Sequence, residues 1–199
     1  MEPNYLPIGF VQSFIGEPMF TLKIENDLEL ALVEPSFAKK YYDIVGKQRD
    51  YLSQWLTWPS HAKSEEFFLS FIKKSLHDYA NGESLVCAMI FCEELVGNIS
   101  FNTISYELKK VEIGYWLSCD YQGKGIVTKS VSKLISYAFN ELNMEKVQIS
   151  AAVDNDSSRR VCERLGFKLE GVISNTENLN GRIVDHAIYG LSRAKWSET

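Results

Sequence analysis

The sequence predicts a mixed α/β domain in which helices flank a single β-sheet. Two observations lead to this class. Residues 84–118 form three short runs rich in apolar, β-branched and aromatic side chains, which is typical of neighbouring strands. Residues 127–142 then carry apolar side chains at helical spacing, and residues 146–153 read as the next strand. This strand, helix and strand form a crossover unit, which we expect to be right-handed with parallel strands.

The N-terminal part is expected to contain an irregular arm and the first two strands. Residues 1–17 show no periodic pattern, and residues 18–199 are expected to form one domain. Within that domain, residues 19–24 and 28–33 read as strands around a polar turn. We find no internal repeat, low-complexity tract or linker composition that would divide the chain further.

Helical patterns come next. A Pro-Ser pair opens a helix that ends at Val45, and the aromatic residues 49–60 are expected to form a short helix and a loop. From Ser64 to about Tyr79 apolar side chains recur at helical spacing, and an Asn-Gly pair ends this helix.

The following strands can be placed face by face. Residues 84–92 and 95–104 read as a hairpin, and residues 109–118 form the strand that follows it. Successive side chains of a strand point to opposite faces of the sheet. One face of the third strand therefore carries Val111, Ile113, Tyr115 and Leu117, and the other carries Glu112, Gly114 and Trp116.

The chain after the crossover unit is expected to finish the same sheet. A short helix at about residues 157–165 stops at Gly166, because glycine favours the backbone conformation that ends helices. Strands at about residues 167–173 and 182–191 follow.

Composition narrows the possible partners. The 199 residues are 45% hydrophobic and 24% charged, as in ordinary globular domains. A net charge of −5 argues against a nucleic-acid partner. The longest apolar run, residues 85–92, is far shorter than the roughly 20 residues of a membrane-spanning helix. The N-terminus has no basic region before an apolar core, so we expect a cytoplasmic protein without a signal peptide.

The four cysteines and three histidines show no metal-ligand spacing. The cysteines form no C-x-x-C pair, and the histidines are scattered along the chain. We therefore expect reduced thiols, mostly buried, and no metal site.

The loop "YQGKGIVTKS", residues 121–130, lies between the third strand and the long helix. Its glycines let successive backbone N–H groups point to one spot, and the first turn of the helix adds unpaired donors and a positive dipole end. Lys124 adds a cation. The loop can therefore bind a phosphate, although a tight turn that serves only geometry explains the glycines equally well.

Known nucleotide-binding patterns fit this loop poorly. The P-loop pattern G-x-x-x-x-G-K-[ST] and the dinucleotide pattern G-x-G-x-x-G both require a glycine where Thr128 stands. The sequence therefore gives little support to an ATP-dependent phosphotransferase.

A different set of motifs, in order, spans nearly the whole chain from residue 19. The segments "EIGYWL", "YQGKG", "NDSSRRVCERLGF" and "DHAIYGLSRAKW", together with "YLSQWLTW", resemble the GCN5-related N-acetyltransferases. Within that superfamily they most resemble the branch that acetylates the N-termini of ribosomal proteins. The resemblance implies a single mixed sheet, acetyl-CoA as cosubstrate, transfer to a primary amine and a possible homodimer.

The resemblance also implies which residues bind coenzyme A. Pyrophosphate would lie on the loop, and pantetheine in a gap where the strand at Trp116 and Leu117 splays from residues 148–151. Val127 departs from the family pattern, which has a small residue there. The implied contacts are Trp116, Leu117, Gln122, Gly123, Lys124, Gly125, Ile126, Val127, Thr128, Asn155 and Ser158. Asn155 could instead simply cap its helix.

Acyl transfer to an amine needs a proton acceptor, because an α-amine with a pKa of about 8 is largely protonated at neutral pH. Glu112 is the candidate base; an ordinary solvated strand glutamate is the alternative.

The departing thiolate needs an acid to protonate it. Many family members have a tyrosine where Cys162 stands here. The resemblance to the ribosomal-protein branch, which places a serine earlier in this helix, makes Ser158 the candidate acid. Ser158 shares one helix face with Cys162 and so faces inward, unless it only satisfies the first turn. No His or Lys in its segment would activate Cys162 as a nucleophile, which favours direct attack by the amine in a ternary complex.

The acceptor pocket is expected between residues 51–58, the helix from Ser64 and the hairpin at residues 177–185. Trp55 and Trp58 could shape it, or could belong to the core. Acidic side chains could attract a cationic amine, or could simply be solvated; they are Glu107, Glu112, Glu177 and Asp185. Protein N-termini, polyamines and aminoglycosides remain open as acceptors, in that order. A CoA-responsive binding protein without catalysis is the alternative class.

Overall fold

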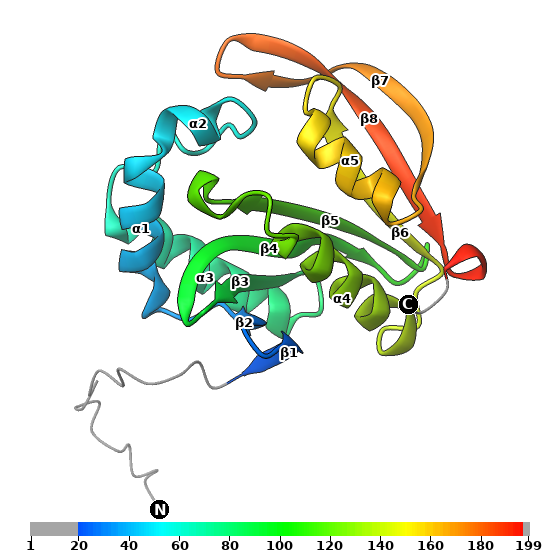
Figure 1. Ribbon diagram of the computed structural model, residues 1–199, viewed down its shortest axis with the longest axis horizontal. Helices are drawn as coiled ribbons and strands as arrows, with labels where there is room; N and C mark the ends of the chain where they lie inside the picture. Colours follow the sequence, from blue (N-terminus) through cyan, green and yellow to red (C-terminus); the bar gives the residue numbers. More distant parts are fainter. Residues whose placement is uncertain (1–19, 197–199) are drawn as a thin grey trace, which may run out of the picture.

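The computed structural model describes residues 20–196, so the predicted arm at residues 1–17 lies outside the described residues. One eight-stranded sheet runs through the molecule in the order β1-β2-β3-β4-β5-β6-β8-β7 (Figure 1). Neighbouring strands are antiparallel except for β5 and β6, which are parallel. This confirms the mixed sheet and the parallel crossover pair. In chain order the strands are β1 Thr21–Glu25, β2 Leu28–Leu32, β3 Leu85–Phe91, β4 Glu94–Ser105, β5 Lys110–Leu117, β6 Lys146–Ala152, β7 Lys168–Leu179 and β8 Arg182–Ser192.

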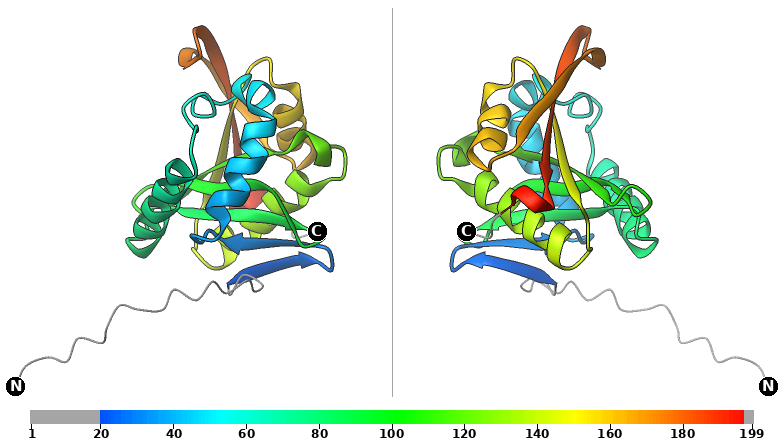
Figure 2. Two further views of the ribbon diagram at one scale, coloured as in Figure 1. Left: turned by 90° about the vertical axis from the view of Figure 1, so that its left-hand side faces the viewer. Right: turned by 90° about the vertical axis from the view of Figure 1, so that its right-hand side faces the viewer.

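Helices cover both faces of this sheet (Figure 2). α4 and α5 contribute to one hydrophobic core, which also contains Val111 and Ile113 of β5. α1 and α3 contribute to a second core on the opposite face, against which Trp116 packs. The predicted division of β5 into two faces is therefore confirmed. The helices are α1 Phe37–Lys47, α2 Arg49–Ser53, α3 Glu65–Ala80, α4 Ile126–Asn140 and α5 Asp156–Arg164, with short 3₁₀ turns at Cys119–Tyr121 and Arg193–Lys195. None of the helices within residues 20–196 is long and apolar enough to cross a membrane.

The main difference from the sequence-based expectation is the length of β7. The strand was expected to end at Ile173, but it continues to Leu179. Its pairing with β8 shifts between Ile173 and Glu177, and Asn175 has a positive φ of 51°. Extra residues of this kind form a β-bulge, which interrupts the side-chain alternation by which strands are recognised in a sequence.

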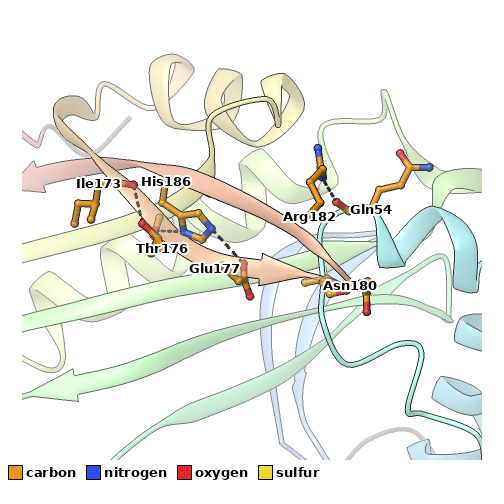
Figure 3. Close-up of polar contacts among 9 residues, drawn as sticks. Gln54, Ile173, Thr176, Glu177, Asn180, Arg182 and His186 are labelled. Atoms are coloured by element: carbon orange, nitrogen blue, oxygen red, sulfur yellow. Dashed lines mark hydrogen bonds and ion pairs between the residues drawn. The ribbon is translucent and has the colours of Figure 1, made fainter.

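The long β7–β8 hairpin reaches across to the segment that follows α2 (Figures 1 and 3). Asn180 Nδ2 donates to the backbone oxygens of Ser53 at 2.9 Å and Leu56 at 3.2 Å. Arg182 donates to the backbone oxygen of Gln54 at 2.8 Å, and its guanidinium lies 5.5 Å from the centre of the Trp55 ring. Two segments more than 120 residues apart thus meet over one end of the sheet.

The close approach of β4 to β5 at Gly97 gives the first prediction. A Cβ at this position would collide with the backbone oxygen of Trp116 and lie 3.0 Å from the Cα of Leu117. We expect Gly97→Ala to lower the free energy of unfolding by about 1–3 kcal/mol, as overpacked sites do, and hence Tm by roughly 2–4 °C per kcal/mol. Gly171→Ala is the matched control, because a Cβ there meets nothing within 4 Å. Equal melting temperatures for the two variants would contradict the prediction.

Candidate active site

The principal cavity passes from one face of the sheet to the other. Its volume is ≈1530 Å³, and its lining includes residues of α4 and α5 on one side and of α3 on the other. Val127 and Ser158 line the first side, and Phe67 and Phe68 line the second. A cavity can cross a sheet only where two strands separate, so the geometry of β5 and β6 decides where the two sides connect.

β5 and β6 pair along only half of their length. Their register runs from Lys110 opposite Lys146 to Ile113 opposite Ile149 and then stops. Beyond that point β5 stays paired with β4 as far as Leu117, and β6 stays paired with β8 as far as Ala152. Each strand therefore follows its outer neighbour, and a gap opens in the sheet. Residues on both sides of the gap line the cavity: Gly114, Tyr115, Trp116, Leu117, Ser150, Ala151 and Ala152.

The glycine loop lies at the α4 end of the cavity. Gly123 and Gly125 both have φ of +75°, a left-handed conformation that favours glycine, and Gly125 precedes the first turn of α4. Val127 packs against the core, which accounts for a branched side chain at this position. Lys124 is not among the cavity-lining residues; its Nζ lies 5.4 Å from each of the rings of Phe91 and Tyr121. The predicted loop residues that do line the cavity are Gln122, Gly123, Gly125, Ile126, Val127 and Thr128.

Arginine side chains of α5 add positive charge near this loop, which the sequence reading had not identified. Arg160 and Arg164 line the cavity, and Arg164 donates to the Thr128 hydroxyl at 2.6 Å. Thr128 is in the first turn of α4, so the contact joins the N-terminal end of one helix to the C-terminal end of another. An anion at the loop would meet helix N–H groups and at least one guanidinium.

Ser158 faces the cavity from the first turn of α5. Asn155 caps the helix, since its side-chain oxygen accepts the backbone N–H of Ser158 at 3.1 Å. The Ser158 hydroxyl lies 2.8 Å from the hydroxyl of Tyr115 on β5. Burial raises the pKa of Tyr115, so this side chain remains a neutral phenol. The sequence had placed Tyr115 on the same strand face as Val111 and Ile113 but missed this contact, because it joins two elements that are distant in sequence.

Glu112 lines the other side of the cavity, one residue before the β5–β6 pairing ends at Ile113. It lies opposite Gln148 in the β5–β6 register, and Gln148 Nε2 donates to Glu112 Oε2 at 3.3 Å. Lys110 Nζ in turn donates to the oxygen of Gln148 at 3.3 Å. Glu112 is therefore held beside the gap, on the α3 face of the sheet.

A second carboxylate lies on the same face, and the sequence reading had named it only as one of several acidic residues. Glu177 Oε2 is 3.2 Å from His186 Nε2 (Figure 3). His186 Nδ1 is 2.8 Å from the Ser150 hydroxyl. All three side chains line the cavity. The three residues lie on three different strands, so no local sequence pattern could have revealed the arrangement.

The predicted acceptor residues have different surroundings. Trp55 and Trp58 line the cavity; Trp58 lies 6.0 Å from Trp116, measured between ring centroids. Asp185 is not among the lining residues. Its carboxylate accepts the backbone N–H of Asn175 at 2.9 Å and so holds the bulge of β7.

Cys162 is fully buried on the inner side of α5. Burial raises the pKa of its thiol to about 12. A neutral, buried thiol is a poor nucleophile, so the geometry favours direct attack by the amine over transfer through Cys162. Among residues 20–196, no group of three or more His, Cys, Asp or Glu side chains could hold a metal ion.

Comparison with known proteins identifies the family. The acetyltransferase (GNAT) domain model matches residues 27–168, which is more than half of the chain. The chain belongs to the GNAT acetyltransferase family. It is therefore an N-acetyltransferase, and the family resemblance read from the motifs is confirmed.

Two curated relatives and one solved structure place the chain more closely within the GNAT family. The putative ribosomal N-acetyltransferase YdaF of Bacillus subtilis (strain 168) is 33% identical over 179 residues, covering 89% of this chain and 98% of that protein. The ribosomal-protein-serine acetyltransferase of Escherichia coli (strain K12) is 33% identical over 169 residues, covering 85% and 94%. RimL, a ribosomal L7/L12 α-N-protein acetyltransferase solved in complex with coenzyme A, has a TM-score of 0.84 at 28% identity, covering 87% and 98%.

The burial of the cysteines gives a second prediction. Cys92 and Cys119 are exposed, whereas Cys87 and Cys162 are buried, and burial raises the pKa of both buried thiols to about 12. We expect iodoacetamide at about pH 8 to modify only the two exposed cysteines of the folded protein. Peptide mass mapping with and without denaturant measures this, and the unfolded chain should be modified at all four. Rapid modification of Cys162 in the folded enzyme would contradict the prediction.

Proposed function

We propose that this enzyme transfers the acetyl group of acetyl-CoA to the α-amine at the N-terminus of a ribosomal protein, in the cytoplasm where ribosomes are made. The observation that carries the proposal is the cavity through the sheet, with the glycine loop at one end, where backbone N–H groups could bind a phosphate, and carboxylates at the other. The names of the relatives support a protein acceptor, and an N-terminal serine is the residue to test first.

Coenzyme A would enter from the α4 side. Its pyrophosphate would bind the backbone of the loop from Gln122 to Thr128, with Arg164 as a further cation. Pantetheine would lie in the gap, where backbone groups of Trp116 and Leu117 no longer pair with β6, and Asn155 lines this path. In this arrangement the thioester reaches the closed end of the gap, near Gly114.

The acceptor would enter from the opposite face. There the cavity is bounded by Trp55 and Trp58, and by the carboxylates of Glu112 and Glu177. An extended polypeptide end is narrow enough to reach the gap, and its α-ammonium would be attracted to the two acidic side chains. Asp185 would contribute indirectly, since it fixes the bulge that carries Glu177 into the cavity.

The proton steps follow from this placement. Glu112 accepts one proton from the α-ammonium, directly or through water, and leaves a neutral amine. The amine nitrogen then bonds to the acetyl carbon, and the carbon–sulfur bond breaks. The Ser158 hydroxyl, positioned by Tyr115, gives a proton to the departing sulfur and regains one from the acylated nitrogen. One proton per turnover remains on Glu112 and is released to solvent.

Acetylation assays with defined acceptors test the proposal. With acetyl-CoA, a peptide with N-terminal serine should gain one acetyl group by mass spectrometry, and the same peptide with a blocked N-terminus should not. Spermidine and an aminoglycoside serve as the alternative acceptors. Acetylation of only the small amines would show that the acceptor is a small amine and not a protein N-terminus. The absence of any transfer, despite binding of acetyl-CoA, would overturn the proposed reaction.

The proposed acid and base give the fourth prediction. We expect Glu112→Gln to lower kcat by at least about 100-fold, the usual minimum contribution of a general base, and Ser158→Ala to lower it by a smaller factor because water can also protonate sulfur. Both variants should still bind acetyl-CoA, as measured by thermal shift. Glu107→Gln is the control, since Glu107 is exposed and does not line the cavity. A wild-type kcat in Glu112→Gln would remove the base assignment.

A further inference from the structure

The acceptor side of the cavity contains an amide side chain that the proposed steps do not use. Asn102 of β4 lines the cavity, and a β-bulge sets its direction. In the β4–β5 ladder Phe101 lies opposite Ile113, and Thr103 lies opposite Glu112. Asn102 is therefore one extra residue of β4 in this ladder. A bulge of this kind bends the strand and re-aims a side chain.

The Asn102 amide lies against Gly114, the residue of β5 at which the gap begins. Pairing of β5 with β6 ends at Ile113, so Gly114 is the first residue beyond it. A Cβ at Gly114 would collide with Asn102 Nδ2 and lie 2.9 Å from Oδ1. The amide thus fills the space that a side chain at position 114 would need, and it borders the closed end of the gap.

A buried serine fixes the orientation of this amide. Ser100 lies opposite Gly114 in the ladder. Its hydroxyl donates to Asn102 Oδ1 at 2.7 Å, the shorter of its two contacts, and lies 3.4 Å from the backbone oxygen of Gly114. With Oδ1 engaged, Nδ2 is the amide atom nearest to the Cβ position of Gly114. Among residues 20–196 no group accepts a hydrogen bond from Nδ2, so its N–H groups can donate to a ligand in the cavity.

The α-amine of a polypeptide has a carbonyl group close to it. The carbonyl oxygen of the first residue lies roughly 3 Å from the amine nitrogen, because only Cα and the carbonyl carbon separate the two atoms. An amine that attacks a thioester beside Gly114 therefore brings this oxygen within reach of a donor next to Gly114. A polyamine such as spermidine has no carbonyl group there.

We propose that Asn102 Nδ2 donates a hydrogen bond to the carbonyl oxygen of the acceptor's first residue, and that this bond selects polypeptide α-amines over simple amines. The inference rests on the proposed function and names the group that recognises the acceptor backbone. Asn102 binds the carbonyl and exchanges no proton. The cavity continues past Asn102, which gives the following residues of the acceptor a path. That part is lined by side chains of α3 and by the residue before β3: Phe71, Lys74, Asp78 and Ser84.

A cycle that changes the enzyme and the substrate tests this bond. The serine peptide is compared with an analogue in which a trans-alkene replaces the first peptide bond and so removes its carbonyl oxygen. For the wild type the alkene should lower kcat/KM by about fivefold, the usual loss for one neutral hydrogen bond. Asn102→Ala should lose a similar factor with the normal peptide and nothing further with the alkene. Because the cycle compares ratios, the altered basicity of the analogue's amine cancels.

Controls separate this bond from general damage to the site. Asn102→Asp keeps the size of the side chain and can still accept from Ser100, but it cannot donate. The alkene should therefore cost this variant nothing, and the variant decides the test if Asn102→Ala fails to fold. Thr103→Ala is the matched control and should behave as wild type, since Thr103 is the next residue of the bulge, exposed and outside the cavity lining. An analogue with the alkene at the second peptide bond should lose as much with Asn102→Ala as the normal peptide does.

The possible outcomes distinguish the inference from the proposed function. If the wild type acetylates the serine peptide and the alkene penalty persists in both Asn102 variants, the inference is wrong and the proposed function stands. The same holds if the variants lose equal factors with the normal and the alkene peptide, because the role of Asn102 would then be independent of the carbonyl. If the wild type acetylates no peptide, the proposed function fails and the inference fails with it.

Discussion

The divergence of β5 from β6 is the feature on which the rest of this structure depends. After Ile113 and Ile149 each strand keeps a full set of partners on its outer side, β4 for β5 and β8 for β6. Opening the sheet therefore costs only the bonds between the two central strands, and ligand amide groups can replace them. The close approach of β4 at Gly97 and the contact of Tyr115 with α5 hold β5 in the diverged position.

Because the opening lies within the sheet, the two substrates can approach from opposite faces. The loop before α4 and the arginines of α5 make one side suitable for a phosphate-containing ligand. The aromatic and acidic side chains of the other face suit a cationic, partly apolar acceptor. In the proposed arrangement the reacting atoms would meet in the plane of the sheet, between the two hydrophobic cores. Such an arrangement needs no covalent enzyme intermediate, which agrees with the burial of Cys162.

The sequence predicted those parts of the fold and site that local patterns encode. Strand alternation assigned the faces of β5, helical spacing located α4, and the glycines identified the loop where φ is indeed positive. It could not predict the long β7, because the bulge at Asn175 interrupts the alternation. Nor could it pair Tyr115 with Ser158, or Glu177 with His186, since each contact is created by sheet order and bulge geometry. The surroundings of Asp185 differ for the same reason: its partner is the backbone of the bulge itself.

The β7–β8 hairpin shows how the acceptor side is kept in register with the gap. α2 is only five residues long, so the carbonyl groups at its end have few partners within the helix. Asn180 and Arg182 donate to the carbonyls of residues 53, 54 and 56 and supply those partners. The same hairpin carries Glu177 and His186. A displacement of its tip would therefore move Trp55 and the Glu177 carboxylate together, and the width of the acceptor entrance is linked to the position of the charge inside it.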